Sequence, residues 1–122
     1  MTFDHPDLLS LLEHSDMAAL DALPFGVIGL DRSSVVSRYN ATEARAAGFS
    51  PEQVIGRRFF ADVAPCMNNY LVALRFEAED VLDVVMDYVF TLRMAPTPVR
   101  LRLLKDASVV TSYVVVLRAA AA

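Results

Sequence analysis

The spacing of apolar residues divides the chain into a helical N-terminal segment, a β-hairpin, a helical middle and three further strands. From Phe3 to Leu23, apolar residues recur at helical spacing but are interrupted at His14-Ser15-Asp16. This predicts two short helices, with Ser15 or Asp16 capping the second. We interpret the segment as an N-terminal cap, and the sequence leaves open that it is instead a dimerisation helix.

Two short apolar runs, 25–30 and 35–39, flank a polar connection of four residues and predict a β-hairpin. A short helix is expected next, because Asn40 is a good N-cap and Gly48 a common C-terminal stop. The start signal is repeated at Ser50-Pro51, which predicts a further helical turn.

After the single cysteine, Cys66, apolar residues again follow helical spacing and predict a helix from about Asn69 to Asp83, with Asn68 or Asn69 as its cap. Cys66 would then lie just ahead of a helix N-terminus, where the macrodipole and free N–H groups favour a thiolate. Because Pro65 fixes its own φ, the thiol should point in a defined direction.

From Met86 to Met94 the apolar period falls to two, which predicts a long, half-buried strand. We expect a turn over 95–98 and a strand over 99–103. The β-branched run 109–117 is typical of a central strand buried on both faces. No role is predicted for residues 118–122.

This order of elements predicts an α+β fold, with helices packed over one face of a five-stranded antiparallel sheet and an N-terminal helical cap. A length of 122 residues fits a single domain, which we divide into the cap (1–23), the core (24–117) and a tail (118–122). The space between helices and sheet is the natural place for a small-molecule pocket.

Composition excludes several classes of function. Apolar residues make up 55% of the chain and charged residues 21%, which argues against disorder. No apolar run approaches the roughly 18 residues of a membrane span, and the N-terminus lacks the order of a signal peptide. We therefore expect a cytoplasmic protein that does not bind membranes. One cysteine and two histidines give neither an internal disulfide nor a metal-ligand cluster.

The net charge of −4 lacks the basic footprint of a nucleic-acid-binding protein. Local basic spots occur at Arg57-Arg58 and at Arg100, Arg102 and Lys105. We interpret these spots as solvated faces, so no nucleic-acid partner is expected.

Three polar residues carry the candidate chemistry. Free cysteines are mostly small buried apolar side chains, so Cys66 by itself is consistent with either packing or reactivity. Tyr39 fits the edge of the core, and Glu43 fits a capping-box carboxylate. Taken together, however, Tyr39 and Glu43 could hold a phenol or similar acid whose other end is bound covalently by Cys66.

On these residues the chain resembles the photoactive yellow protein family, small blue-light receptors with a PAS fold, over nearly its whole length. Generic PAS domains lack an Asp-Val-Ala-Pro-Cys run with a tyrosine and a glutamate at these spacings. The matching motifs are Leu20-Asp21-Ala22-Leu23-Pro24-Phe25-Gly26-Val27-Ile28, Tyr39-Asn40-Ala41 with Glu43, Gln53-Val54-Ile55-Gly56, Phe59-Phe60 with Asp62-Val63-Ala64-Pro65-Cys66, and Met94 with Pro96-Thr97.

The resemblance implies a p-coumaric acid (4-hydroxycinnamoyl) chromophore joined to Cys66 as a thioester. Its phenolate would accept hydrogen bonds from Tyr39 and from a protonated Glu43. A buried carboxyl without a cationic partner has a raised pKa and can remain a donor at neutral pH. The pocket that the resemblance implies consists of Ile28, Ala47, Phe49, Phe59, Val63, Ala64, Phe90 and Met94.

By the same resemblance, light isomerises the chromophore, Glu43 gives its proton to the phenolate, and the new buried charge loosens the cap, 1–23. An unknown signalling protein would read this change. The chain departs from the family at Ala47, where a threonine is usual, and at Phe49, where an arginine is usual. The loop after Cys66 also looks shorter, and Leu92 and Val114 replace aromatic residues.

Phe49 and Ala47 predict a drier phenolic end, a less tightly held Tyr39, and an altered colour, chromophore pKa or recovery rate. They also leave open a PAS-like sensory or protein-interaction module that has lost photochemistry. An enzyme with a Cys66 nucleophile is disfavoured, because neither histidine lies in a motif that could serve as its base. We therefore expect no enzymatic activity.

Overall fold

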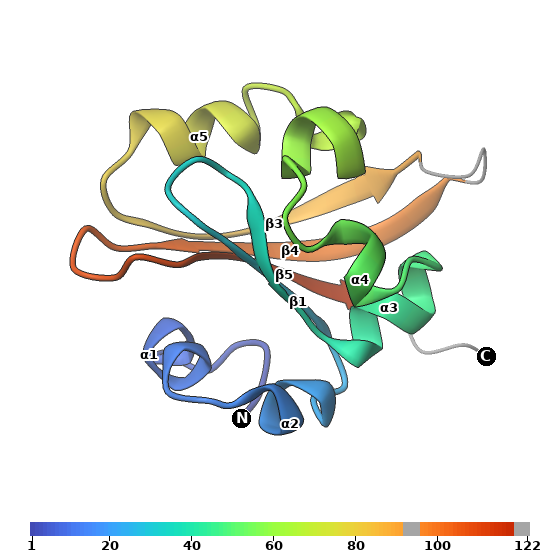
Figure 1. Ribbon diagram of the computed structural model, residues 1–122. Helices are drawn as coiled ribbons and strands as arrows, with labels where there is room; N and C mark the ends of the chain where they lie inside the picture. The colour runs from blue at the N-terminus through green and yellow to red at the C-terminus, as the bar shows by residue number, and fades with distance from the viewer. Residues whose placement is uncertain (92–95, 119–122) are drawn as a thin grey trace.

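The structure of the protein is a computed structural model, and the residues that it describes are 1–91 and 96–118. Its centre is a five-stranded antiparallel sheet (Figure 1), as the sequence predicted, and the strand order is β2-β1-β5-β4-β3. The strands are β1 (Gly26–Leu30), β2 (Val36–Tyr39), β3 (Leu82–Phe90), β4 (Thr97–Lys105) and β5 (Ser112–Arg118).

The N-terminal helices, in blue, lie on one side of the sheet, and the yellow helix labelled α5 lies on the other (Figure 1). In the described ranges, no helix has both the length and the apolar character needed to cross a membrane. The helical elements are α1 (Leu8–Glu13), α2 (Met17–Asp21), α3 (Ala41–Ala47), α4 (Pro51–Val54), a π-helical turn (Phe59–Val63), a 3₁₀ turn (Pro65–Met67) and α5 (Ala73–Ala78).

The helical N-terminal segment forms a cap on one face, and its helices match those predicted. The side chain of Asp16 caps α2 by accepting from the backbone N–H of Ala19 at 2.8 Å. Apolar side chains of α1 and α2 pack against alternate residues of β1 and β5, including Val27 and Tyr113. The cap therefore buries one face of the central strands.

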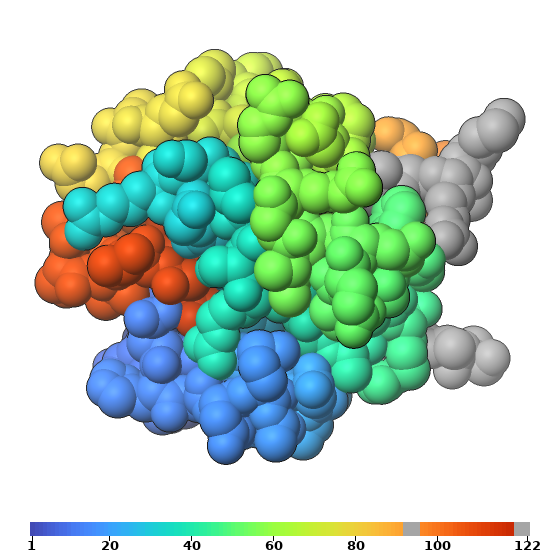
Figure 2. Space-filling view, in the orientation of Figure 1, coloured from blue at the N-terminus to red at the C-terminus, as the bar shows by residue number. Residues whose placement is uncertain are grey.

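The opposite face of the same strands forms the main core with α3, α4, α5 and the two turns. Ile28 and Val114, each next in sequence to a residue that faces the cap, lie in this core. This alternation is the period of two expected of a strand. It confirms that β5 is a central strand buried on both faces. The space-filling view shows segment 50–66, in green, above the blue cap (Figure 2).

The helix predicted over 69–83 is much shorter in the structure, where α5 spans only Ala73–Ala78. Apolar residues that suggested its length, such as Tyr70 and Val81, are 73% and 64% exposed. Asn69 ends the preceding turn by accepting from the N–H groups of Leu71 and Val72. The helical spacing was therefore coincidental over much of this segment.

Cys66 consequently does not precede a helix N-terminus, as the sequence had suggested. It lies in the 3₁₀ turn Pro65–Met67, and α5 begins only at Ala73. The helix-dipole argument for a thiolate at Cys66 is wrong, because the dipole acts only over the first turn of a helix.

Three strand boundaries also differ from prediction. β3 begins at Leu82 rather than Met86, because pairing with β4 extends to Leu82 opposite Lys105. β4 begins at Thr97, inside the predicted turn, and β5 runs over Ser112–Arg118 rather than 109–117. The predicted positions Leu92 and Met94 lie outside the described residues.

The prediction that Arg102 belongs to a solvated face is wrong. Its side chain is buried and donates to the backbone carbonyls of Phe3 and His5 at 2.8 and 2.7 Å. It also forms a two-pronged ion pair with Asp83 at 2.8 and 2.9 Å. Arg102 therefore joins the N-terminal cap to the sheet.

Candidate ligand site

A small cavity lies between the sheet and the helical elements of the main core. Its volume is about 20 Å³, about the space of one water molecule. Met94, the eighth predicted pocket residue, lies outside the described residues, and Met67 is an addition that the sequence did not suggest. The lining residues are Ile28, Tyr39, Glu43, Ala47, Phe49, Phe59, Val63, Ala64, Met67 and Phe90.

Glu43 is a buried carboxyl in the first turn of α3, only 3% exposed. The backbone N–H of Asn40 donates to Val27 at 3.1 Å, so Glu43 is not needed to cap it. The capping-box alternative therefore does not describe this residue. A Cβ atom at Gly26 would lie 2.1 Å from Glu43 Oε1, so the absence of a side chain on β1 makes room for the carboxyl.

Arg118 is the partner of this carboxyl, although the sequence gave it no role. Its Nη1 lies 2.6 Å from Glu43 Oε1 and its Nη2 lies 3.1 Å from Oε2. The assumption that Glu43 lacks a cationic partner is therefore wrong. Local sequence patterns could not find this pair, because its members are 75 residues apart.

The electrostatics of Tyr39 and Glu43 are dominated by burial. Burial raises the pKa of Glu43 above its usual value, and the bonds from Arg118 offset part of this rise. Burial and the nearby Glu43 also raise the pKa of Tyr39, with Arg118 again acting in the opposite direction. Both groups thus favour their protonated forms more than they would in water.

Tyr39 ends β2 and lines the cavity, and the residue is 2% exposed. Among the described residues its hydroxyl has no hydrogen-bond partner, although the apolar body of the ring packs in the main core. The hydroxyl is therefore available to a ligand in the cavity.

Cys66 packs against the main core but is not itself one of the residues that line the cavity. The thiol residue is partly exposed, and its neighbours Ala64 and Met67 line the cavity. Its backbone carbonyl accepts from the Tyr88 hydroxyl at 2.7 Å and from Asn69 Nδ2 at 3.2 Å. These bonds fix the backbone that carries the sulfur.

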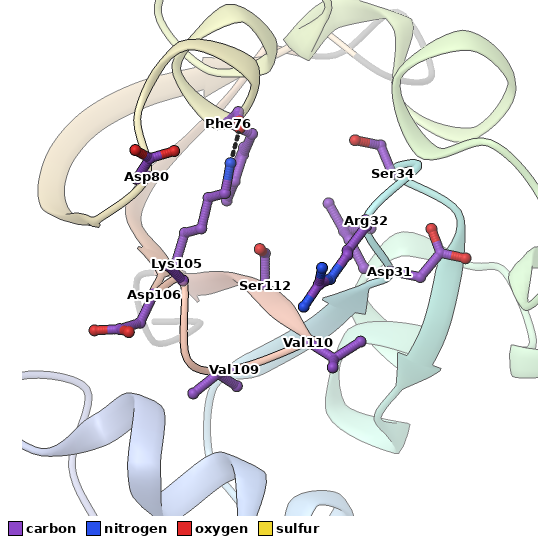
Figure 3. A pocket seen from close by; sticks show the side chains of 12 residues that line it. Asp31, Arg32, Ser34, Phe76, Asp80, Lys105, Asp106, Val109, Val110 and Ser112 are labelled. Carbon is purple, nitrogen blue, oxygen red and sulfur yellow. Dashed lines mark hydrogen bonds between the residues drawn. The ribbon is translucent and has the colours of Figure 1, made fainter.

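A second, larger crevice of about 290 Å³ lies at the opposite end of β5 (Figure 3). It includes Ser112, the first residue of β5, whereas Arg118, the last, contacts Glu43. Lys105 in this crevice donates to the carbonyl of Phe76. None of the site residues predicted from the sequence lines it, so the smaller cavity remains the candidate site.

Comparisons with known proteins agree with the fold. The sequence model of the PAS fold matches residues 20–87. The chain is 39% identical over 114 residues to photoactive yellow protein of Halochromatium salexigens, covering 91% of this chain and 90% of that protein. It is 36% identical over 104 residues to photoactive yellow protein of Rhodothalassium salexigens, covering 83% of each.

A solved structure gives the same result in three dimensions. The photoactive yellow protein domain from the sensor histidine kinase Ppr of Rhodospirillum centenum superimposes with a TM-score of 0.81 and is 38% identical. The match covers 89% of this chain and 98% of that one.

Proposed function

Since the chain belongs to the photoactive yellow protein family and has its PAS fold, we propose that it is a blue-light photoreceptor. In this proposal Cys66 carries p-coumaric acid as a thioester. The observation that carries the proposal is the arrangement of Tyr39 and Glu43 on one apolar cavity, with the only thiol of the chain beside it.

The donor set fits such a ligand. A phenolic end needs hydrogen-bond donors, which Tyr39 and a protonated Glu43 supply, and the ring needs the apolar walls that Ile28 and Phe59 provide. The cavity volume is too small for an acyl group of about eleven heavy atoms. We therefore propose that loading widens the cavity by moving the partly buried side chains Phe49 and Val63.

When bound, the chromophore supplies an isomerisable double bond and a phenolate oxygen that can accept a proton. Cys66 Sγ holds its acyl end at the more exposed side of the site. Tyr39 Oη donates to its buried end, and Glu43 holds a proton at a carboxyl oxygen, as its raised pKa favours. The apolar walls exclude water from both donors.

Loss of the Glu43 proton would be transmitted to the cap through Asn40. The side-chain oxygen of Asn40 accepts from the N–H of Glu43 at 3.0 Å, and its amide nitrogen donates to the carbonyls of Leu20 and Phe25 at 2.8 and 3.1 Å. One buried side chain thus connects the start of α3 to the end of the cap. This connection supports the proposal that the light signal is a loosening of the N-terminal cap, 1–23.

The output partner is proposed to be a signalling protein. The similar structure from Rhodospirillum centenum is a domain of a sensor histidine kinase, which shows one setting in which such a domain occurs. We propose sensory and not enzymatic activity, because neither histidine of the chain is among the described residues that line the cavity.

The decisive experiment supplies an activated 4-hydroxycinnamic acid to the purified protein in the dark. We expect a mass gain of one acyl group and a visible absorption band that bleaches under blue light and recovers. Cys66→Ser should abolish both, whereas Ser108→Ala, at an exposed turn, should change neither.

A sensory PAS module without photochemistry is the second candidate, and the small cavity favours it. This candidate predicts no mass gain, or a gain without light-dependent absorption. Either result would contradict the photoreceptor proposal.

A further inference from the structure

We infer that Arg118 is the counter-ion of the buried polar end of this site, and that it restricts the site to ligands whose buried end carries negative charge. The identity of the ligand rests on the proposed function, whereas the role of Arg118 toward Glu43 does not.

The geometry of Arg118 is that of a positioning group. Two nitrogens of its guanidinium meet both oxygens of Glu43, at 2.6 and 3.1 Å, which is the two-pronged arrangement that fixes a carboxylate best. The guanidinium carbon also lies 5.6 Å from the centroid of the Phe90 ring, which lines the cavity. Arg118 therefore contacts two walls of the site at once.

Arg118 is held by the sheet rather than by a loop. It is the last residue of β5 and pairs with Val99 of β4. Its side chain is 22% exposed, and that of Glu43 only 5%. The pair is thus mostly withdrawn from water, where opposite charges interact more strongly than at the surface.

The groups that act electrostatically on this carboxyl come from each element packed around it. They are Tyr39 at the end of β2 and Arg118 on β5; β1 contributes the uncharged Gly26. Arg45, on α3 itself, is exposed. Within residues 1–91 and 96–118, one cation, Arg118, therefore faces two acidic groups, Tyr39 and Glu43.

A single cation balances a single negative charge. When an anionic ligand enters beside Tyr39 and Glu43, two anions and one cation would share a dry site unless Glu43 takes up a proton. When Glu43 gives that proton back, its O–H bond breaks, an O–H bond forms on the ligand, and the charge moves to the carboxylate. Arg118 faces the negative charge in both cases.

The positive charge of Arg118 takes the place of a charge that Phe49 does not supply. The position at which the family usually has an arginine is apolar here, so it cannot bring a positive charge to the site. Arg118 brings that charge from β5 instead. A neutral ligand would leave the Arg118 guanidinium paired with Glu43 alone. Such a ligand would gain no binding energy from the charge of Arg118.

The first test needs no ligand. Side-chain carboxyl NMR would follow the titration of Glu43 in the unloaded wild type, in Arg118→Gln and in Arg100→Gln. Arg100 is the matched control, a strand arginine that pairs with the exposed Asp87 at 3.4 Å. Arg118→Gln should raise the pKa of Glu43 by about 1 to 3 pH units, the usual effect of losing a close opposite charge.

Arg100→Gln should leave that titration unchanged. An unshifted titration in a folded Arg118→Gln protein would overturn the inference. If Arg118→Gln does not fold, Arg118→Lys provides the test of the positioning role. This variant keeps the positive charge but loses the two-pronged geometry. Its Glu43 titration should then rise by less than about one pH unit; no change would overturn a positioning role.

The second test uses protein loaded with 4-hydroxycinnamic acid and follows absorption against pH. Arg118→Gln should raise the midpoint of phenol ionisation by about 1 to 3 pH units, and Arg100→Gln should not. An unchanged midpoint would overturn the selection of an anionic ligand. If the wild type cannot be loaded while the Glu43 titration shifts as expected, the photoreceptor proposal fails and the counter-ion role stands.

Discussion

Each face of the sheet has an arginine that links it to a neighbouring part of the chain, and the two arginines differ in their burial and in the groups that they bind. On the cap face, Arg102 binds the backbone carbonyls of Phe3 and His5 and pairs with Asp83, whose side chain is 49% exposed. On the pocket face, Arg118 binds Glu43, whose side chain is 5% exposed. The pair on the pocket face therefore contains a buried carboxyl whose pKa burial raises, whereas the acid of the pair on the cap face is half exposed.

The two arginines therefore differ in whether the groups that they bind can change charge. Carbonyl acceptors keep their hydrogen bonds at every pH, so Arg102 gives the cap a constant attachment. The charge of Glu43 can change, and Asn40 links the backbone of that residue to the cap. The comparison therefore places the variable element on the pocket face and the constant one on the cap face.

Asn40 should be the most costly residue to remove, because it belongs to both faces. Asn40→Ala would remove four buried hydrogen bonds, those to the backbone groups of Val27, Glu43, Leu20 and Phe25. We expect the free energy of unfolding to fall by about 3 kcal/mol or more in urea titrations. Asn68→Ala, at an exposed position, should change it by less than about 0.5 kcal/mol. Equal losses would refute the link between faces.

Arg102→Gln should release the cap without affecting the pocket. Loss of the bonds to Phe3, His5 and Asp83 is expected to lower the free energy of unfolding by about 2 kcal/mol. Limited proteolysis should then cleave within 1–23 more rapidly. The titration of Glu43 should stay as in the wild type; a shifted titration would show that the faces are not separable.

Gly26→Ala should disturb the pocket face alone. The added Cβ would lie 2.1 Å from Glu43 Oε1, so the carboxyl must move away from Arg118. The expected loss in the free energy of unfolding is about 1 to 3 kcal/mol, as for other overpacked positions. NMR should show changed Glu43 and Arg118 side-chain signals with an unchanged cap; unaltered side-chain signals would contradict the close contact.

The pH dependence of stability should come partly from Glu43. Its pKa is raised on folding, so the folded state binds more protons than the unfolded state above pH 4.5, the ordinary value for this carboxyl. This contribution to stability is full below that pH and is lost as pH rises through the raised pKa. Urea titrations from pH 4.5 to about 8 should show a flatter profile for Glu43→Gln than for the wild type. Identical profiles would contradict the raised pKa.

Phe49→Arg is expected to have the smallest effect. A second cation near the polar end should lower the ionisation midpoint of a bound phenol by less than about one pH unit, because Arg118 already supplies a charge there. Absorption titration of the loaded variant measures this shift. A shift larger than that produced by Arg118→Gln would reverse the assignment of the two positions.

Local signals in the sequence predicted the parts of the fold that local interactions form. The Asp16 and Asn40 caps, the Gly48 stop and the alternation of the central strands are all set by residues a few positions apart. The length of α5 was wrong because exposed apolar residues such as Tyr70 and Val81 imitate a helical stripe. Pairing with β4, which is remote in sequence, determines where β3 begins.

The site was predicted less completely than the fold. Family motifs brought Tyr39, Glu43 and Cys66 to attention, and their roles in binding stay predictions. Arg118 has no local motif and was assigned to the tail, although its β5 position places it against Glu43. The burial of Arg102 escaped notice for the same reason, since its acceptors lie almost a hundred residues earlier in the chain.

The partial exposure of Cys66 bears on how such receptors would mature. Because Cys66 is only partly buried, a thioester at this residue would not have to form while the polypeptide is still being made. Protein without chromophore could then accumulate and be loaded later. Sensitivity to light would then depend on the supply of the activated chromophore. The same chromophore-free protein could be loaded in the laboratory with synthetic chromophores of other colours.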